Sequence, residues 1–398
     1  MNEGSRLPLG SRSGVAEQLQ QARTRFAKQI QQQGHIKSAA LIEGLAAVPR
    51  ENFVGPGPWK IMRAAEMAKG YQLTPDDDPR HLYDNVLVAL DERRMLNNGE
   101  PLALLLFLDS LTLRAGDRFL HIGCGVGYYT AIAAHAVGPH GTAVAVEIDR
   151  ALAERAKLNL QSYGTVQVVT NNGTLDHFGT FDAIFVNAGC ARPHSIWLDQ
   201  LAVGGRLLLP LTVGLPTMPG IGAGSMLLMT RGETEYSAKF TSPVGIFHCE
   251  GARSAEEDAL LAKAFAGGDR GSVCRLRRDA HEPGPNCWLH SSDVCLESDP
   301  ALRQGPRAPV HVDSDILANY VGRYQLAPDV VLTVTQRDGG LFAQAPRAPE
   351  VPIYPESEKK FFYKAVDAQI SFITDGTGRA TGLVLRHDGG EVTAQRVD

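Results

Sequence analysis

The chain has 398 residues, of which 43% are hydrophobic and 21% charged, and its formal net charge is -5. These values are typical of a folded protein of two domains and exclude a disordered or membrane-bound chain. The acidic balance argues against nucleic acid or an anionic membrane as the main partner. The longest apolar run, residues 101–108, is too short to cross a bilayer, and the N-terminal segment lacks the apolar core of a signal peptide.

Six cysteines are scattered along the chain without a CxxC pair. Their spacing favours neither a disulfide framework nor a zinc site, although Cys274, Cys287 and Cys295 lie near one another in the sequence. We therefore expect reduced thiols, no bound metal and a cytoplasmic protein.

Residues 1–100 are expected to form helices followed by ordered loops. Helical periodicity covers residues 15–50 with a break at Gly34, and Ser38 is a suitable N-cap for the second helix. Beyond these helices, Pro, Gly, Asn and Asp are dense around one short β-like run at 85–90.

Residues 101–255 are expected to form a doubly wound, mostly parallel sheet, because apolar strands alternate with amphipathic helices. We predict strands at 119–122, 142–148, 166–170, 181–187 and 205–211, and helices at 102–111, 128–137, 150–163 and 195–201. The runs 225–230 and 236–241 could form an antiparallel hairpin at the sheet edge.

The character of the chain changes twice more. Residues 256–314 are expected to be an irregular extension that contains a short helix at 254–265 and a Pro/Gly-rich linker at 303–309. Residues 315–398 hold short strands separated by DG and GG turns, the pattern of a hairpin-rich meander.

The most informative segment joins the strand at 119–122 to the next helix through Gly123, Gly125 and Gly127. Glycines allow a tight turn and close ligand approach, and a helix N-terminus offers unpaired N–H groups. Glu147 ends the following strand, where an acid would bind ribose hydroxyls. A bare turn kept for packing would not require this acid. The loop lacks the GxGxxG of a dinucleotide site, which favours an adenosyl ligand with an amino-acid tail over a nicotinamide cofactor.

These residues resemble the protein-L-isoaspartate O-methyltransferase family, a branch of the S-adenosylmethionine-dependent methyltransferases. The resemblance covers residues 20–250 and rests on motifs in family order: AVPRENFV (47–54), LRAGDRFLHIGCGVGYYTAIAA (113–134), VAVEIDRALAERAKLNL (144–160), NNG (171–173), FDAIFVNAGCA (181–191) and LAVGGRLLLPL (201–211). It implies an α/β, Rossmann-like methyltransferase sheet with N-terminal helices. It also implies S-adenosyl-L-methionine as methyl donor and a carboxylate of a peptide, protein or natural product as acceptor.

Carried over by position, the resemblance implies which residues hold the cofactor. The three loop glycines would cradle its methionine end, Glu147 would hold the ribose hydroxyls, and Asn172 would lie near adenine, where the family usually has aspartate. The full predicted set is His121, Gly123, Cys124, Gly125, Gly127, Tyr128, Glu147, Ile148, Asn172 and Gly173.

Other positions also depart from the family pattern. His121 replaces the acidic residue that opens the loop and helps to hold the ammonium end of the cofactor; a core role is an equally good interpretation. Cys124 replaces a small hydroxyl residue, and there loop packing is preferred. Gly99 stands where the closing segment TISQP of the family has its serine, which counts against an isoaspartyl substrate.

The predicted acceptor-side residues are Asn98, Gly99 and Asn187. Asn187 ends the fourth strand, where such sheets present groups to ligands. Asn98 could orient a carboxylate or simply form a turn before Gly99. The leading prediction is an O-methyltransferase acting on a carboxylate. The alternatives are true isoaspartyl repair and a non-catalytic cofactor-binding scaffold.

The C-terminal residues 315–398 resemble the small β-barrel-like domain found behind serine β-lactamase-like hydrolases. The resemblance rests on YVGRY (320–324), the run from YPES to FF (354–362) and GLVLRHDGG (382–390). It implies a small all-β domain with a structural or substrate-presenting role. The sequence predicts no oligomeric state.

Overall fold

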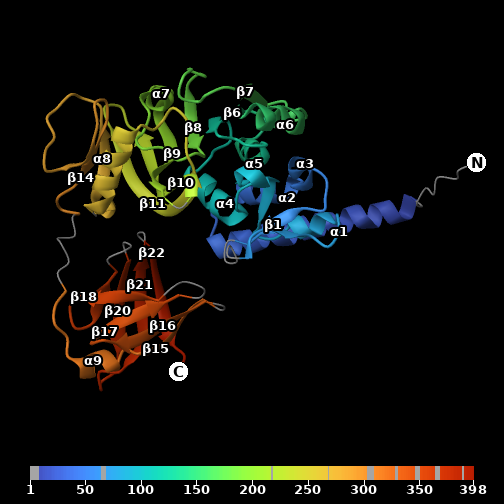
Figure 1. The fold of residues 1–398 in the computed structure, drawn as a ribbon. Coiled ribbons are helices and arrows are strands. Elements are labelled where there is room, and N and C mark those ends of the chain that lie inside the picture. Colours follow the sequence, from blue (N-terminus) through green and yellow to red (C-terminus); the bar gives the residue numbers. More distant parts are fainter. Residues whose placement is uncertain are drawn as a thin grey trace, which may run out of the picture.

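The computed structural model describes residues 9–398 except 64–68, 217, 268, 303–308, 328–329, 346–349, 364–367 and 388–389. The predicted linker at 303–309 therefore lies almost wholly outside the described residues. Figure 1 shows an α/β part, which includes the N-terminal helices, and a strand-rich C-terminal part.

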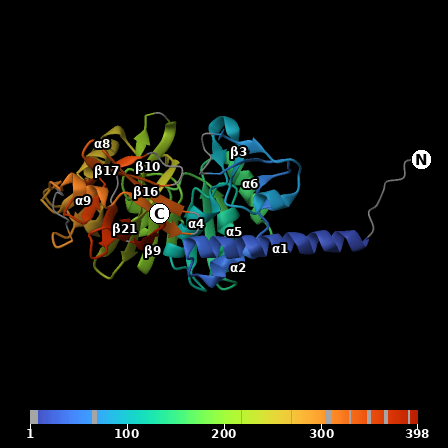
Figure 2. The same cartoon turned by 90° about the horizontal axis from the view of Figure 1, so that it is seen from below.

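Helices and a small sheet precede the main sheet. Ser38 caps the second helix as predicted, since its side chain accepts a hydrogen bond from the backbone N–H of Leu41. The helices are α1 (Leu9–Gly34), α2 (Ala39–Ala47) and α3 (Glu51–Val54), and α1 lies alongside α2 (Figure 2). The small sheet has the order β2-β1-β3-β4, with β1 (Lys60–Met62), β2 (Gln72–Leu73), β3 (Leu87–Asp91), β4 (Leu96–Asn97) and the 3-10 turns η2 (Pro79–Leu82) and η3 (Glu92–Arg94).

The main sheet confirms the predicted doubly wound arrangement. Its ten strands have the order β13-β14-β12-β11-β10-β9-β8-β5-β6-β7. The last five strands in this order, from β9 to β7, run parallel to one another. Chain order reverses between β5 and β8, the place where open α/β sheets bind ligands. The parallel strands are β5 (Arg118–Ile122), β6 (Thr142–Glu147), β7 (Val166–Thr170), β8 (Phe181–Val186) and β9 (Leu201–Leu215).

Helices cover both faces of this sheet. Successive β5 residues therefore point into two different hydrophobic cores. Phe119 packs in a cluster with α1, α2, α4 (Pro101–Ser110) and α5 (Tyr128–Val137). Leu120 packs in the opposite cluster with α7 (Ser195–Asp199) and α8 (Ala255–Ala266). The remaining helix, α6 (Arg150–Leu160), follows β6.

The sheet extends further than predicted. The antiparallel hairpin of β10 (Met218–Arg231) and β11 (Tyr236–Phe247) forms as expected, but it lies inside the sheet, not at the edge. The prediction that residues 256–314 are irregular is wrong for 273–298, where strands of four or five residues carry too little periodicity to be recognised. These are β12 (Val273–Arg277), which follows the turn η4 (Arg270–Ser272), β13 (Cys287–His290) and β14 (Cys295–Ser298). The domain boundaries near 100, 255 and 314 stay a prediction.

The C-terminal strands close into a barrel, which confirms the predicted all-β domain. Its core is aromatic: Tyr320 stacks on Phe372 at 4.5 Å between ring centroids, and Phe361 is fully buried. The elements are α9 (Ser314–Ala318), β15 (Gly322–Ala327), β16 (Val330–Arg337), β17 (Gly340–Gln344), β18 (Val351–Pro355), β19 (Lys360–Phe362), β20 (Ala368–Thr374), β21 (Ala380–His387) and β22 (Gly390–Arg396).

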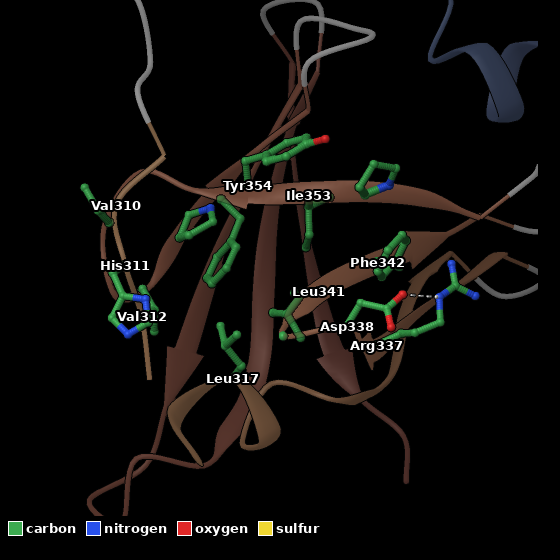
Figure 3. Close-up of a pocket in the computed structure, with 15 residues that line it drawn as sticks. Val310, His311, Val312, Leu317, Arg337, Asp338, Leu341, Phe342, Ile353 and Tyr354 are labelled. Atoms are coloured by element: carbon green, nitrogen blue, oxygen red, sulfur yellow. Dashed lines mark ion pairs between the residues drawn. The ribbon is translucent and has the colours of Figure 1, made fainter. Parts of the chain in front are cut away.

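A cavity of about 330 Å³ opens on this barrel between β17, β18 and the segment at 310–312 (Figure 3). Its wall is mainly apolar and includes Leu341, Phe342 and Ile353, with the Arg337–Asp338 pair at one side. The cavity belongs to the barrel alone. Among the described helices, none combines the length and the apolarity that a membrane crossing needs.

His121, on β5, lies in the core of the main sheet. Its ring stacks on Phe185 at 5.1 Å between centroids, and its Nδ1 lies 2.9 Å from Thr130 Oγ1. Its Nε2 is buried without a hydrogen-bond partner. Burial lowers the pKa of His121 to about 3, so the imidazole is neutral near pH 7. The geometry favours the core interpretation of this residue.

The burial of a neutral imidazole predicts acid sensitivity. An unfolded chain protonates His121 below about pH 6.5 and the folded chain does not, so stability should fall as the pH drops from 6.5 toward 3. We expect about 1 kcal/mol per pH unit from this group. In denaturant unfolding between pH 7 and 5, His121→Asn should flatten this slope. His135→Asn, which removes an exposed histidine of α5, is the control. An unchanged slope in His121→Asn would contradict the assignment.

Candidate functional site

One carboxylate joins the glycine loop to the end of β6. Glu147 accepts hydrogen bonds from the backbone N–H groups of Gly125, at 2.7 Å, and Asp149, at 2.9 Å. Burial raises the pKa of Glu147, and the two N–H groups oppose that rise because they favour the charged form. The carboxylate therefore faces the loop at the ligand-binding end of the sheet.

The loop combines a tightly packed glycine with one that borders open space. A Cβ on Gly127 would lie 2.6 Å from Leu160 Cδ1, so a larger residue here would force the Leu160 side chain of α6 to shift. A Cβ on Gly125 would meet nothing within 4 Å. Both residues have positive φ, 90° and 57°, which disfavours any larger residue. Backbone at Gly125 is thus left accessible to a ligand.

Asn187 flanks the same loop from the other side of the order reversal. Its backbone N–H donates to the carbonyl of Ile122 at 2.8 Å, and its Nδ2 donates to the carbonyl of Gly123 at 3.4 Å. The fold therefore brings the strand-end asparagine and the first loop glycine together.

The residues predicted near ribose and adenine differ in their surroundings. Ile148, directly after Glu147, is 44% exposed and offers an apolar surface. Asn172 uses its Oδ1 in a local turn, accepting from the Thr174 N–H at 3.0 Å and hydroxyl at 2.8 Å. Gly173 is required by packing, because its Cβ would lie 2.6 Å from a methyl of Ile122.

Cys124 and Tyr128 are buried in the loop and helix start. The Cys124 thiol lies 3.7 Å from the carbonyl oxygen of Gly125, and burial raises its pKa. Tyr128 packs edge-on against Phe53 at 5.4 Å, and its hydroxyl is buried without a hydrogen-bond partner. These contacts agree with packing roles for both side chains.

The segment at Gly99 is held by Arg50, which the sequence analysis did not single out. Arg50 is fully buried and donates to the carbonyls of Leu82 at 3.1 Å, Val86 at 2.8 Å and Gly99 at 3.2 Å. The hydroxyl of Tyr129 donates to the same Gly99 carbonyl at 3.2 Å. Arg50 is the last residue of the VPR tripeptide in the motif AVPRENFV, and this motif was the sequence signal that could have identified it.

The backbone itself requires glycine at position 99. Its φ is 74°, and a Cβ would lie 3.1 Å from Leu104 and 3.2 Å from Tyr129. Asn97 forms the turn, accepting from the Gly99 N–H at 2.9 Å. Asn98 is 7% exposed and its Nδ2 is buried without a partner. Buried donors are rarely left unpaired, so this amide is a candidate ligand contact.

Two family models match the chain. Residues 21–217 match protein-L-isoaspartate(D-aspartate) O-methyltransferase, and residues 306–396 match a domain of unknown function, DUF3471. The curated protein-L-isoaspartate O-methyltransferase 1 of Geotalea uraniireducens is 33% identical over 180 residues, which cover 44% of this chain and 71% of that protein. The Thermotoga maritima enzyme of the same name is 32% identical over 162 residues, which cover 39% of this chain and about half, 49%, of that protein.

A solved structure named protein-L-isoaspartate O-methyltransferase aligns with 94% of this chain and 100% of its own, at 17% identity and a TM-score of 0.46. The Geotalea relative shares a third of the aligned residues, and the alignment covers 71% of its length. The region matched by the family model, residues 21–217, contains the glycine loop and Glu147. This chain belongs to the protein-L-isoaspartate O-methyltransferase family.

Proposed function

We propose that this chain is an S-adenosyl-L-methionine-dependent O-methyltransferase whose acceptor is a carboxylate of a peptide or protein. The observation that carries the proposal is the Glu147 carboxylate, which meets the open glycine of the loop at the switch point of the sheet. The names of the family relatives support it. The free state of the described cysteines is compatible with action in the cytoplasm.

On the donor side, the cofactor would be held by backbone groups of the glycine loop and by one acidic side chain, that of Glu147. Gly123, Gly125 and Gly127 would cradle the methionine end, Glu147 would hold the ribose hydroxyls, and Ile148 would contact the adenine face. When bound, S-adenosyl-L-methionine supplies a methyl group activated by a sulfonium. His121 is neutral, so this chain holds the ammonium end without the charge that the family has at that position.

The acceptor side would use amide donors. The amides of Asn98 and Asn187 can orient a carboxylate, and methyl transfer needs alignment and desolvation more than acid–base help. Arg50 acts as a positioning residue, because it fixes the Gly99 carbonyl next to Asn98. Isoaspartyl repair is the second candidate, favoured by the names of the relatives and opposed by the backbone at Gly99.

Loss of the strand-end acid should weaken cofactor binding. Hydrogen bonds to a charged group contribute about 1.5–3 kcal/mol, so Glu147→Ala should lower the affinity for S-adenosyl-L-methionine about ten- to a hundredfold in calorimetry. Glu154→Gln, on the exposed side of α6, is the matched control and should leave affinity unchanged. A Glu147→Ala affinity within about twofold of wild type would refute the ribose assignment. Both the enzyme and the non-catalytic cofactor-binding scaffold require bound S-adenosyl-L-methionine. No detectable binding by the wild type would therefore contradict both.

The acceptor class can be read from the chemistry of the product. With labelled methyl donor, we expect label in peptides that carry a free carboxylate and none in the same peptides after amidation. The label should be released as methanol by mild base, because it is held as an ester. An isoaspartyl and an aspartyl peptide of identical sequence separate repair from broader methylation. Base-stable label would contradict O-methylation of a carboxylate.

Restoring the family's hydroxyl at position 99 should not restore a repair preference. Gly99→Ser forces a side chain into a positive-φ backbone and against Leu104, so we expect a loss of about 1–3 kcal/mol in unfolding free energy. Gly116 has a comparable φ of 89°, and a Cβ there would meet nothing within 4 Å. Gly116→Ser therefore measures the loss of unfolding free energy that comes from the backbone conformation alone. Equal stability of Gly99→Ser and wild type, with a gain on the isoaspartyl peptide, would contradict this interpretation.

A further inference from the structure

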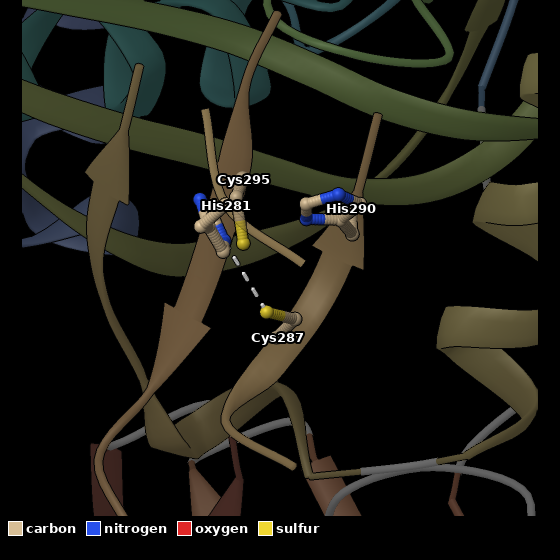
Figure 4. A group of neighbouring side chains, drawn as sticks. All are labelled: His281, Cys287, His290 and Cys295. Atoms are coloured by element: carbon tan, nitrogen blue, oxygen red, sulfur yellow. Dashed lines mark hydrogen bonds between the residues drawn. The ribbon is translucent and has the colours of Figure 1, made fainter. Parts of the chain in front are cut away.

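Four side chains with metal-ligating atoms meet at the end of the ten-stranded sheet. They are His281, Cys287, His290 and Cys295, and one ligand atom from each lies within 4.8 Å of the others. Figure 4 shows the two thiols and the two imidazoles turned toward one another. The cluster lies between residues 217 and 306, which neither family match covers.

The β13–β14 hairpin places three of the four. His290 and Cys295 are direct partners across the hairpin, and Cys287 begins β13. Residues three apart on a regular strand point to opposite faces, so Cys287 and His290 would normally separate. A register shift between Cys287 and Leu289 changes this alternation. His281 comes from the loop that precedes the hairpin.

One distance in the cluster matches the separation of two ligand atoms around a tetrahedral zinc ion. His281 Nε2 lies 3.5 Å from Cys287 Sγ. Zinc bonds of about 2.0–2.1 Å to nitrogen and about 2.3 Å to sulfur place two such atoms about 3.5 Å apart. His281 Nδ1 lies 2.9 Å from the carbonyl oxygen of Asp279, so an Nδ1–H donor there leaves the Nε2 lone pair for the cluster.

Two further observations point to a bound ion: one contact to Cys287 and one unpaired nitrogen of His290. The backbone N–H of Gly284 donates to Cys287 Sγ at 3.2 Å, a bond that stabilises a thiolate. The Nδ1 of His290 is buried without a hydrogen-bond partner. Cys295 is 1% exposed, and both cysteines are free thiols. An unpaired buried imidazole nitrogen beside two thiols and a second imidazole is an arrangement that a bound ion would stabilise.

We propose that His281, Cys287, His290 and Cys295 bind one structural Zn²⁺. Two thiolates and two imidazoles form a Cys2His2 set, whose soft sulfur and nitrogen donors select zinc over calcium or magnesium. Four protein ligands complete the tetrahedron, so the ion has a structural role. It ties the loop after β12 to β13, the terminal strand in the sheet order, and thereby secures that end of the sheet.

This inference replaces the expectation of no bound metal, which rested on the lack of a CxxC pair. The spacing here is His-x5-Cys-x2-His-x4-Cys, and the hairpin, not a CxxC turn, brings the ligands together. The site is independent of the proposed methyl transfer.

The test measures metal in the full chain, expressed with zinc in the medium and purified with a thiol reductant and without chelator. Elemental analysis should find one zinc per chain. After replacement by Co²⁺, the visible absorption of tetrahedral thiolate-bound cobalt should appear. Cys287→Ser and Cys295→Ser should each lose both signals. Cys274→Ser, on the neighbouring β12 and outside the cluster, is the matched control and should retain both.

His281→Gln provides a second variant, because His281 lies on a loop and its loss leaves the hairpin strands intact. It should lower zinc content while the far-ultraviolet circular dichroism stays that of wild type. A chelator should lower the melting temperature of wild type and Cys274→Ser more than that of His281→Gln. Zinc-free wild type, or zinc content unchanged in Cys287→Ser and His281→Gln, would overturn the proposal. A Cys287–Cys295 disulfide in the freshly purified chain would overturn it as well.

Discussion

The candidate site depends on the buried carboxylate of Glu147, which would be costly without its two backbone donors. Those donors, Gly125 and Asp149, belong to different connections, so the carboxylate couples the loop after β5 to the turn after β6. Asp149 also caps α6 through Leu152 and pairs with Arg94 of η3. Glu147 and Asp149 together thus link the glycine loop, α6 and the turn between β3 and β4 of the small N-terminal sheet.

The segment at Gly99 depends on a second buried charge. The guanidinium of Arg50 donates to three backbone carbonyls and, among the described residues, to no carboxylate, so it holds the loops at Leu82, Val86 and Gly99 together. Next to it, Glu51 pairs with Arg23 at 3.3 Å and accepts from the Tyr83 hydroxyl. The glycine at position 99 completes this network through its carbonyl. Its positive φ and the close approach of Leu104 and Tyr129, and not the carbonyl itself, favour glycine there over the family's serine.

The antiparallel end of the sheet is held by few ladder hydrogen bonds. Beyond the parallel strands it continues through long antiparallel strands and ends in the short pairs of β12, β14 and β13. Strands of four residues make few ladder hydrogen bonds, and a terminal strand has one neighbour in the sheet order. A metal held by the last hairpin and its preceding loop would supply stability where the ladder supplies little. The barrel, by contrast, has no free edge and has its own aromatic core.

The sequence by itself determined the parallel sheet, the Ser38 cap, and the glycine loop followed by Glu147, because these depend on periodicity and spacing within about thirty residues. It could not decide between two roles for His121, which the stacked Phe185 and the Thr130 contact resolve toward the core. It missed Arg50, whose carbonyl partners lie 32 to 49 residues away. It also missed the cluster at 281–295. Both depend on which backbone segments lie side by side, and that is decided when packing and strand register bring distant residues into contact.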